Sequence, residues 1–361
     1  MDEIITTTLV IGDVHLGIRR DDKWVYDYQY EALKKVTDYA KDNGIKTICQ
    51  TGDFFDVRSS VSQITLNRVR TEIMPLFDGL QLIIPVGNHD MRYREMIEPN
   101  TLDEVLGYYD NVTIINKPTK IMLDDKVAID IIPWICNENR DDIMDFIKKS
   151  KTKYCVGHFE LDGYYFYQGM KSSGADPSFL KKYKRVFSGH YHTISEGGNV
   201  LYVGTPYTLT SGDGNDSRGV WELQFTNKKC TEKFIENDVM NHVKIRFNAD
   251  TFDKKTVSDY KGKHLDVKVV KRESDNGKMN VNKFEQLLID AGVHSLKISD
   301  TINYDDIELV TSDDIIIKDN MDLVQDYISQ LDCDDNSKKH IKRMFDSMYI
   351  EAIKLKSDAG L

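Results

Sequence analysis

One layout recurs five times along this chain of 361 residues: a short apolar run, then a glycine, then residue types that bind metal ions. The carboxyl ends of strands in an α/β sheet meet at one edge, where ligands bind. Glycine allows the sharp turns needed there. The layout therefore predicts that all five segments reach one shared site. The segments are Gly12–His15, Gly52–Asp56, Gly87–Asp90, Gly157–His158 and Gly189–His192.

The first 220 residues alternate short apolar strands with amphipathic helices. This rhythm predicts an α/β layered domain with a largely buried sheet. Helices are expected over residues 27–43 and 61–78. Strands are expected over residues 8–11, 46–50, 82–86, 113–115, 127–132, 154–156, 186–187 and 201–203.

The rhythm changes near residue 238, and the remaining chain predicts a small α+β module followed by C-terminal helices. In the module, strands are expected over 243–247, 264–270 and 295–299, with a helix over 281–291. The predicted division of the chain is a nuclease domain over 1–237, a DNA-facing cap over 238–299, an acidic linker with a first helix over 300–335, and a docking helix over 336–361.

The net acidic charge of the chain is confined to one segment, so it excludes fewer functions than the total charge suggests. The net charge is −11, but residues 300–335 hold twelve acidic residues against one lysine, so the rest of the chain is neutral. The acidic total therefore does not exclude a DNA substrate. No apolar run approaches the roughly 18 residues that span a bilayer, and no basic leader is seen. Five scattered cysteines without a CxxC pair indicate reduced thiols and a cytoplasmic protein.

The donor types in the five segments are carboxylates, one amide and several imidazoles, without a thiolate. This set favours Mn²⁺, Fe²⁺ or Zn²⁺ over Ca²⁺, and over a structural cysteine-rich zinc site. Seven ligands exceed what one ion needs when it also holds water and substrate. They suit two ions about 3.5–4 Å apart that share a bridging carboxylate.

In this order the five segments resemble the calcineurin-like metallophosphoesterase superfamily. Within it the chain is most similar to the SbcD-like double-strand-break-repair exonucleases, and closest to the recombination endonuclease subunits of large tailed phages. The resemblance implies a four-layer α/β/β/α metallophosphoesterase sandwich with a small α+β cap domain and C-terminal helices. Further stretches that carry the resemblance are residues 132–134, 156–161, 189–196 and 204–209.

The resemblance also implies the roles of the site residues. Asp53 bridges two divalent ions, Mn²⁺ by preference with Mg²⁺ as the alternative. His89 faces the scissile phosphate as a transition-state stabiliser or general acid, and Asp56 orients it through a hydrogen bond. One ion takes Asp13, His15, Asp53 and His192; the other takes Asp53, Asn88, His158 and His190.

The activity implied is that of a metal-dependent DNA exonuclease and endonuclease subunit acting at DNA ends in recombination, repair and replication. Its implied partners are DNA, an SbcC-like ABC-type ATPase and a second copy of the chain, in the host cytoplasm if the chain is phage-encoded. The segment 61–78 is expected at the homodimer contact. Candidate DNA contacts are Arg92, Arg94 and Lys171, with an aromatic loop at 164–167.

The apolar stripe on the last helix is interpreted as an ATPase-docking element, because the implied complex needs one. Two other functions stay open at this point: a phosphatase of the same superfamily acting on a phosphoprotein or nucleotide, and a non-catalytic scaffold subunit. The residues of the stripe are Ile341, Met344, Phe345, Met348 and Tyr349.

Overall fold

The structure is a computed structural model that describes residues 4–167, 170–226, 228–239, 241–247, 254–271, 281–302, 337–339, 341–345 and 347. The chain divides into two units, 1–302 and 303–361. The finer division predicted from the sequence, with boundaries after residues 237, 299 and 335, stays a prediction. Most of the predicted acidic linker lies outside the described residues.

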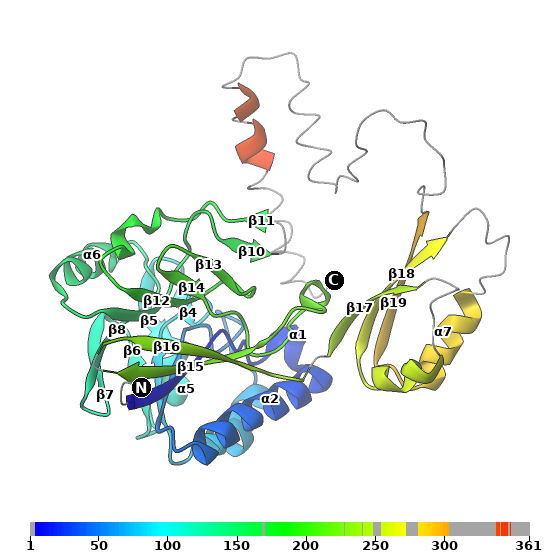
Figure 1. Ribbon diagram of the computed structural model, residues 1–361, viewed down its shortest axis with the longest axis horizontal. Helices are drawn as coiled ribbons and strands as arrows, with labels where there is room; N and C mark the ends of the chain where they lie inside the picture. The colour runs from blue at the N-terminus through cyan, green and yellow to red at the C-terminus, as the bar shows by residue number, and fades with distance from the viewer. Residues whose placement is uncertain are drawn as a thin grey trace. The chain divides into compact units, whose positions relative to one another are not determined.

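Two six-stranded sheets form the centre of the first unit (Figure 1). The first sheet has the order β16-β15-β1-β2-β3-β6 and the second has the order β13-β14-β12-β9-β8-β7. The first comprises β1 (Ile4–Ile11), β2 (Thr47–Gln50), β3 (Gln81–Pro85), β6 (Val112–Ile115), β15 (Gly219–Thr226) and β16 (Cys230–Glu236). The second comprises β7 (Thr119–Leu123), β8 (Val127–Ile132), β9 (Tyr154–His158), β12 (Arg185–Gly189), β13 (Ser195–Gly197) and β14 (Val200–Tyr202).

Side-chain alternation along the strands builds three apolar layers. In β1, Leu9 and Ile11 belong to the core on the helix-covered face, while Val10 points to the core between the two sheets. This is the two-residue period of a strand that is buried on both faces. In the second sheet, Val156 faces the first sheet and Cys155 faces the opposite layer.

Helices cover the outer face of each sheet. Helix α2 (Lys23–Asp42) packs on the first sheet, and helix α6 (Arg140–Lys149) packs on the second. In Figure 1 these two helices lie on opposite sides of the sandwich. The layers therefore follow the order α/β/β/α, and the predicted fold class is confirmed. Shorter helical pieces are α1 (Ile18–Asp21), α3 (Gln63–Arg68), α4 (Met74–Leu76), α5 (Thr101–Leu106), η2 (Pro177–Leu180) and η3 (Ser211–Asp213).

The helix expected over 61–78 is interrupted. A π-helical turn, Val69–Ile73, separates α3 from α4, and the Met74 N–H donates to the carbonyl of Val69 five residues back. Pro75 follows at once, and proline supplies no N–H and crowds the carbonyl four residues before it. A wider turn just ahead of the proline relieves that crowding.

Two strand pairs and a small sheet complete the first unit. The pairs are β4 (Met91–Tyr93) with β5 (Met96–Asn100), and β10 (Tyr165–Tyr167) with β11 (Met170–Lys171). The small sheet β17-β18-β19 is parallel and has its own apolar core, as expected of the α+β module. Its elements are β17 (His242–Phe247), η4 (Lys254–Tyr260), β18 (His264–Lys271), α7 (Val281–Asp290) and β19 (Ser295–Ile302).

The described residues of the second unit, between Ser337 and Ser347, are helical. Of the predicted docking stripe, Ile341 and Met344 are exposed. Phe345 is partly exposed, and Met348 and Tyr349 lie outside the described residues. Among the helices that the structure describes, none has the length and apolarity to cross a membrane.

Candidate dimetal centre

All five predicted segments meet where the carboxyl ends of β1, β2 and β3 from one sheet approach those of β9 and β12 from the other. The side chains they deliver include every metal ligand that was predicted from the sequence. The edge that the strand pattern predicted is thus formed by both sheets of the sandwich. The predicted ligand residues are Asp13, His15, Asp53, Asn88, His158, His190 and His192.

One group of donors is Asp13, His15 and His192. The Nε2 atoms of the two histidines are 3.1 Å apart. Both nitrogens face the same carboxylate, because Asp13 Oδ2 lies 4.0 Å from His15 Nε2 and 3.9 Å from His192 Nε2. The three side chains therefore point their donor atoms at one small volume.

The second group is Asp53, His158 and His190, joined by the amide of Asn88. His158 Nε2 lies 3.2 Å from Asp53 Oδ2 and 2.9 Å from Asn88 Oδ1. The same amide oxygen is 3.0 Å from His190 Nδ1. Asp53 also accepts the backbone N–H of His89 at 2.7 Å through its other oxygen, so both carboxylate oxygens are engaged within the cluster.

The spacing and the outer contacts of these histidines fit metal ligation. Two ligands bound at about 2.1 Å and roughly perpendicular to each other lie about 3 Å apart, as the His15 and His192 nitrogens do. His158 points its Nδ1 at the carbonyl of Thr51, at 2.9 Å, which leaves Nε2 for a cation. His15 likewise turns Nδ1 to Asp56 Oδ1, at 3.2 Å, and its Nε2 toward Asp13.

The electrostatics of the cluster also call for positive charge. Burial opposes protonation of His15 and His158, but the facing carboxylates outweigh it and raise the pKa of each imidazole to about 9. Burial, together with the charge on His15, lowers the pKa of His192 to about 3. The carboxylate of Asp56 chiefly favours the protonated form of His15, and those of Asp53 and Asp13 favour the protonated form of His158. A divalent cation supplies the same charge, so the residues fit a metal centre.

The backbone is strained at three of these ligands. His15, Asp53 and His190 have φ values of 50°, 56° and 87°. The left-handed region costs a residue with a Cβ of order 1–3 kcal/mol, and such strain gathers at functional sites. Here it is held by hydrogen bonds, because the carbonyl of Asp53 accepts the N–H groups of Val14 and His15.

The sequence profile of one family, described as "Calcineurin-like phosphoesterase", matches residues 6–193, a span that includes every predicted metal ligand. The chain belongs to the calcineurin-like phosphoesterase family. The predicted relationship is confirmed, and with it the character of the site as a histidine and aspartate cluster of a metal-dependent phosphoesterase.

A curated relative lies much nearer than the family as a whole. The chain is 41% identical over 347 residues to "Exonuclease subunit 1" of Enterobacteria phage T4, and the match covers 95% of this chain and 98% of that protein. The chain is thus a homologue of a phage exonuclease subunit, in agreement with the predicted resemblance.

Solved structures with lower similarity include a dimetal phosphatase from Danio rerio, with a TM-score of 0.44 and 9% identity over 64% of this chain and 96% of that one. Another is the GAP50 anchor of the Plasmodium inner membrane complex, with a TM-score of 0.42 and 15% identity over 65% of this chain and 85% of that one. The family assignment rests on the profile and the phage relative.

The two predicted catalytic residues of this phosphoesterase lie beside the first donor group. His89 is partly exposed, and its Nδ1 is 2.6 Å from the backbone carbonyl of Asp56. The carboxylate of Asp56 is turned instead toward His15. Asp56 therefore contacts both histidines, one through its main chain and the other through its side chain.

The candidate DNA contacts lie on the two small strand pairs. Arg92 is exposed in β4 and Arg94 in the turn that follows β4, and the Arg92 guanidinium lies 5.6 Å from the centre of the Tyr93 ring. Lys171 is exposed on β11, with its ammonium 5.3 Å from the ring centre of Tyr165. The predicted aromatic loop, residues 164–167, consists of β10 and the residue before it.

Several residues that organise the centre were missed by the sequence analysis. Asp90 is fully buried, and its carboxylate accepts the backbone N–H groups of Asp53, Phe54, Phe55 and Gly87 at 2.9–3.1 Å. It thereby ties the loop after β2 to the loop after β3. Its place directly after Asn88-His89 was the available signal, because a carboxylate beside two ligands either binds metal or holds their loops.

Two further side chains hold ligand loops from a distance. Gln50 donates to the carbonyls of Gly12 and Gly52 at 3.2 and 2.7 Å. Arg218, the residue directly before β15, is buried and donates a hydrogen bond to the main-chain carbonyl of His192. No local sequence pattern marks either residue, since the contacts of Gln50 with Gly12 and of Arg218 with His192 join segments that are far apart along the chain.

Proposed function

We propose that this chain is the nuclease subunit of a DNA end-processing complex, which hydrolyses phosphodiester bonds with two metal ions. The observation that supports the proposal is the convergence of the seven predicted ligand side chains in a chain that is 41% identical to a phage exonuclease subunit along nearly its whole length. A phosphodiester is the bond that an exonuclease must break.

The proposed ligand sets follow the two donor groups. Asp13, His15 and His192 would hold one ion, while Asn88, His158 and His190 would hold the other. Asp53 would bridge them, because its carboxylate contacts His158 of one group and its negative charge helps to raise the pKa of His15 in the other. Mn²⁺ is the proposed ion, with Mg²⁺ as the alternative, since mixed oxygen and imidazole donors suit Mn²⁺.

When bound, two such ions would activate a water molecule and offset the charge of the phosphate. The protein's own contribution centres on His89. With Nδ1–H donated to the carbonyl of Asp56, the imidazolium form keeps an Nε2–H for a phosphoryl or leaving-group oxygen. The carboxylate of Asp56 holds the ring of His15 and thereby positions a ligand.

Substrate and partner contacts are proposed on the outer surfaces. Arg92, Arg94 and Lys171 would contact phosphates of the DNA, because each is exposed on a strand pair. Exposed Ile64 and Leu66 on α3 make the segment 61–78 the proposed homodimer contact. Exposed Ile341 and Met344 support the proposal that the last helix docks on an ABC-type ATPase.

The test is hydrolysis by the full-length protein of an end-labelled DNA duplex in Mn²⁺, with and without a chelator. We expect metal-dependent shortening of the labelled strand, and a drop of roughly 10²–10³-fold in His89→Asn, the scale of one lost transition-state donor. His294→Asn, which changes a histidine distant in sequence from the five segments, is the matched control and should cleave normally.

Two results would contradict the proposal. Release of inorganic phosphate from a terminal phosphomonoester without any shortening would indicate a phosphatase instead. DNA shortening that persists unchanged in both His89→Asn and Asp53→Asn would show that the nuclease activity belongs to another protein, and would make this chain a scaffold.

A further inference from the structure

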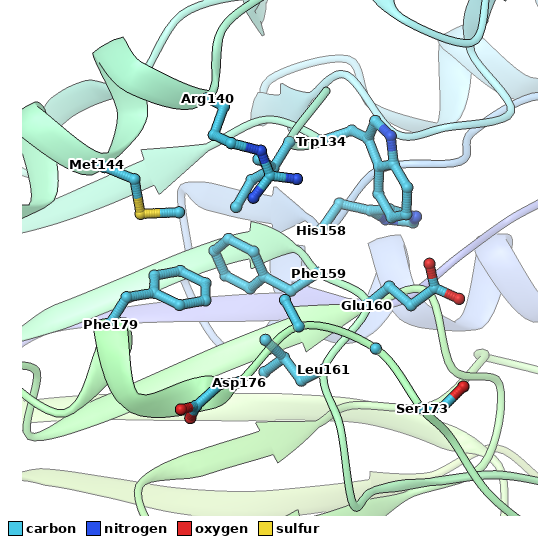
Figure 2. Close-up of a pocket in the computed structure, with 13 residues that line it drawn as sticks. Trp134, Arg140, Met144, His158, Phe159, Glu160, Leu161, Ser173, Asp176 and Phe179 are labelled. Atoms are coloured by element: carbon cyan, nitrogen blue, oxygen red, sulfur yellow. The ribbon is translucent and has the colours of Figure 1, made fainter. Parts of the chain in front are cut away.

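A cavity of about 560 Å³ opens directly beside the candidate metal centre. It lies between α6, the end of β9 and the segment that leads into η2. Figure 2 shows the side chains that surround it. Its volume falls within the range of roughly 300–1,000 Å³ that is usual for small-molecule sites. The walls include Trp134, Arg140, Met144, Phe159, Glu160 and Phe179.

The rim of the cavity is a fixed part of the fold. The N–H of Ala175 donates to the carbonyl of Glu160 at 2.8 Å, and the N–H of Asp162 donates to the carbonyl of Ala175 at 2.9 Å. A Cβ on Gly174 would lie only 2.4 Å from the Glu160 carbonyl oxygen, so glycine is required for this close approach. The two chain segments therefore form one connected wall, and the cavity exists before any ligand arrives.

The chemistry of the walls is aromatic on several sides and cationic at one point. Phe159, Phe179 and Trp134 present rings, and Met144 adds a polarizable thioether. Figure 2 shows the guanidinium of Arg140 pointing into the cavity between Trp134 and Met144. Within the described part of the chain, no side-chain hydrogen bond or ion pair is found for this guanidinium. Its donors are available to a ligand.

The cavity borders the metal centre. The ring of His158 lines it while its Nε2 faces Asn88 and Asp53. The Trp134 ring is centred 5.7 Å from the His158 ring and 5.0 Å from the His190 ring. Glu160, a wall residue, places its carboxylate 3.8 Å from His190 Nε2. Whatever fills the cavity must therefore be joined to, or lie next to, the group that reacts.

We propose that this cavity binds the unpaired nucleobase of the nucleotide adjoining the scissile phosphate. The inference rests on the proposed nuclease function and deepens it, by making the substrate at the reacting position an unstacked nucleotide. A base is flat and apolar on its faces, which suits the aromatic walls, and it carries acceptors at its edge, which suit the guanidinium of Arg140. Hydrolysis next to a duplex end then requires that end to fray.

The proposal is tested with single-stranded oligonucleotides that carry one abasic residue at a fixed position. Cleavage of the phosphates beside that residue by the full-length protein in Mn²⁺ is compared with cleavage of the same phosphates in the intact strand. We expect the wild-type protein to cleave the intact strand faster by about fivefold to 150-fold, the range of the stacking contribution of one base. Phosphates elsewhere in the strand serve as the internal reference.

Two pocket variants and one control localise the effect. Arg140→Ala and Phe179→Ala should each bring the intact-to-abasic rate ratio several-fold nearer to one. Lys148→Ala removes a positive charge from the same helix without touching the cavity, and should keep the wild-type ratio. Equal cleavage of both strands by the wild-type protein, or a ratio unchanged in both pocket variants, would overturn the proposal while leaving the nuclease function in place.

A binding measurement separates the two proposals if no strand is cleaved. An oligonucleotide with 2-aminopurine at its end is titrated with the full-length protein in a chelator, where hydrolysis is stopped. Stacking of the base should quench its fluorescence, and Phe179→Ala should weaken that quenching several-fold relative to Lys148→Ala. Quenching without cleavage in Mn²⁺ would support the base site and count against the nuclease function, whereas no quenching would count against the base site.

Discussion

The first unit contains two clusters of histidines with opposite electrostatic surroundings. Five histidines gather at the candidate metal centre, among the carboxylates of Asp13, Asp53 and Asp56. Three others gather around Trp24 of α2. His294 stacks on the Trp24 ring with centres 4.2 Å apart, and His242 lies 5.3 Å from His264. In this second cluster a cation faces a histidine, because the Arg19 guanidinium lies 3.4 Å from His242 Nε2.

The difference is visible in the pKa values. Carboxylates raise the pKa of His15 and His158 to about 9 in spite of burial. Burial, reinforced by Arg19, lowers the pKa of His242 to about 3 and also lowers that of His264. Among the described residues, the second cluster adds no group of three metal-binding side chains. Histidine alone therefore does not mark a metal centre; the facing carboxylates do.

Of the changes that test this contrast between the two histidine clusters, removal of the negative charge of Asp53 should have the largest effect. Asp53→Asn keeps the shape of the side chain but removes the negative charge shared by both donor groups. We expect DNA hydrolysis to fall by at least roughly 10³-fold, beyond the 10–100-fold typical of an outer-sphere residue. We expect the manganese content to fall from two ions per chain, measured by elemental analysis of protein equilibrated with Mn²⁺.

The control for this experiment comes from the other cluster. His264→Gln replaces a histidine whose Nδ1 bonds Ser295 Oγ, and it should still bind two ions. Retention of both ions by Asp53→Asn, or loss of one by His264→Gln, would remove the distinction between the clusters.

A smaller effect is expected at Asp56, whose carboxylate touches His15 from outside the ligand group. Asp56→Ala leaves the main-chain carbonyl that accepts from His89, but removes the group that orients His15. We expect a 10–100-fold loss in the affinity of the weaker manganese site, measured by titration calorimetry. Asp27→Ala, an exposed carboxylate paired with Lys23, is the control. Normal manganese affinity combined with lost hydrolysis would place the action of Asp56 on His89 instead.

The convergence of the predicted ligand side chains could be foreseen from the sequence because the rule behind it is local. Each follows a short apolar run and a glycine, and the edge of an α/β sheet collects such positions whatever the strand order. Short apolar runs likewise predicted buried strands such as β1 and β9. Both features are properties of a few consecutive residues, which a single sequence displays directly.

The contacts between elements were not predictable in the same way. The Asp56 carboxylate meets His15, and Arg140 shares a cavity with Phe179, only because particular strands and loops are neighbours. That order, with β9 between β12 and β8, leaves no periodic trace in the sequence. Arg19, Arg20 and Asp21 adopt left-handed backbone that no residue type there signals. Tertiary packing imposes these features.

The smallest predicted effect concerns the second cluster and acid stability. Because the pKa of His242 falls from an unfolded value near 6.5 to about 3, the neutral form is favoured in the fold. This preference contributes fully to stability above pH 6.5, and the contribution is lost as the pH falls toward 3. The loss of stability reaches about 2 kcal/mol at pH 5. Arg19, His264 and, least, His294 add to this preference, and Asp213 opposes it.

Urea unfolding of the chelated full-length protein at pH 7 and pH 5 measures this loss. His242→Gln should lower stability at pH 7, because the contacts with Trp24 and Thr208 are weakened, yet lose less on acidification than the wild type. His294→Gln changes an exposed ring and should keep most of the wild-type pH dependence, because His294 makes the smallest of the contributions to the pKa of His242. Equal losses in all three proteins would mean that His242 binds a proton as readily in the folded as in the unfolded chain. The contrast between the second cluster and the carboxylate-lined centre would then fail.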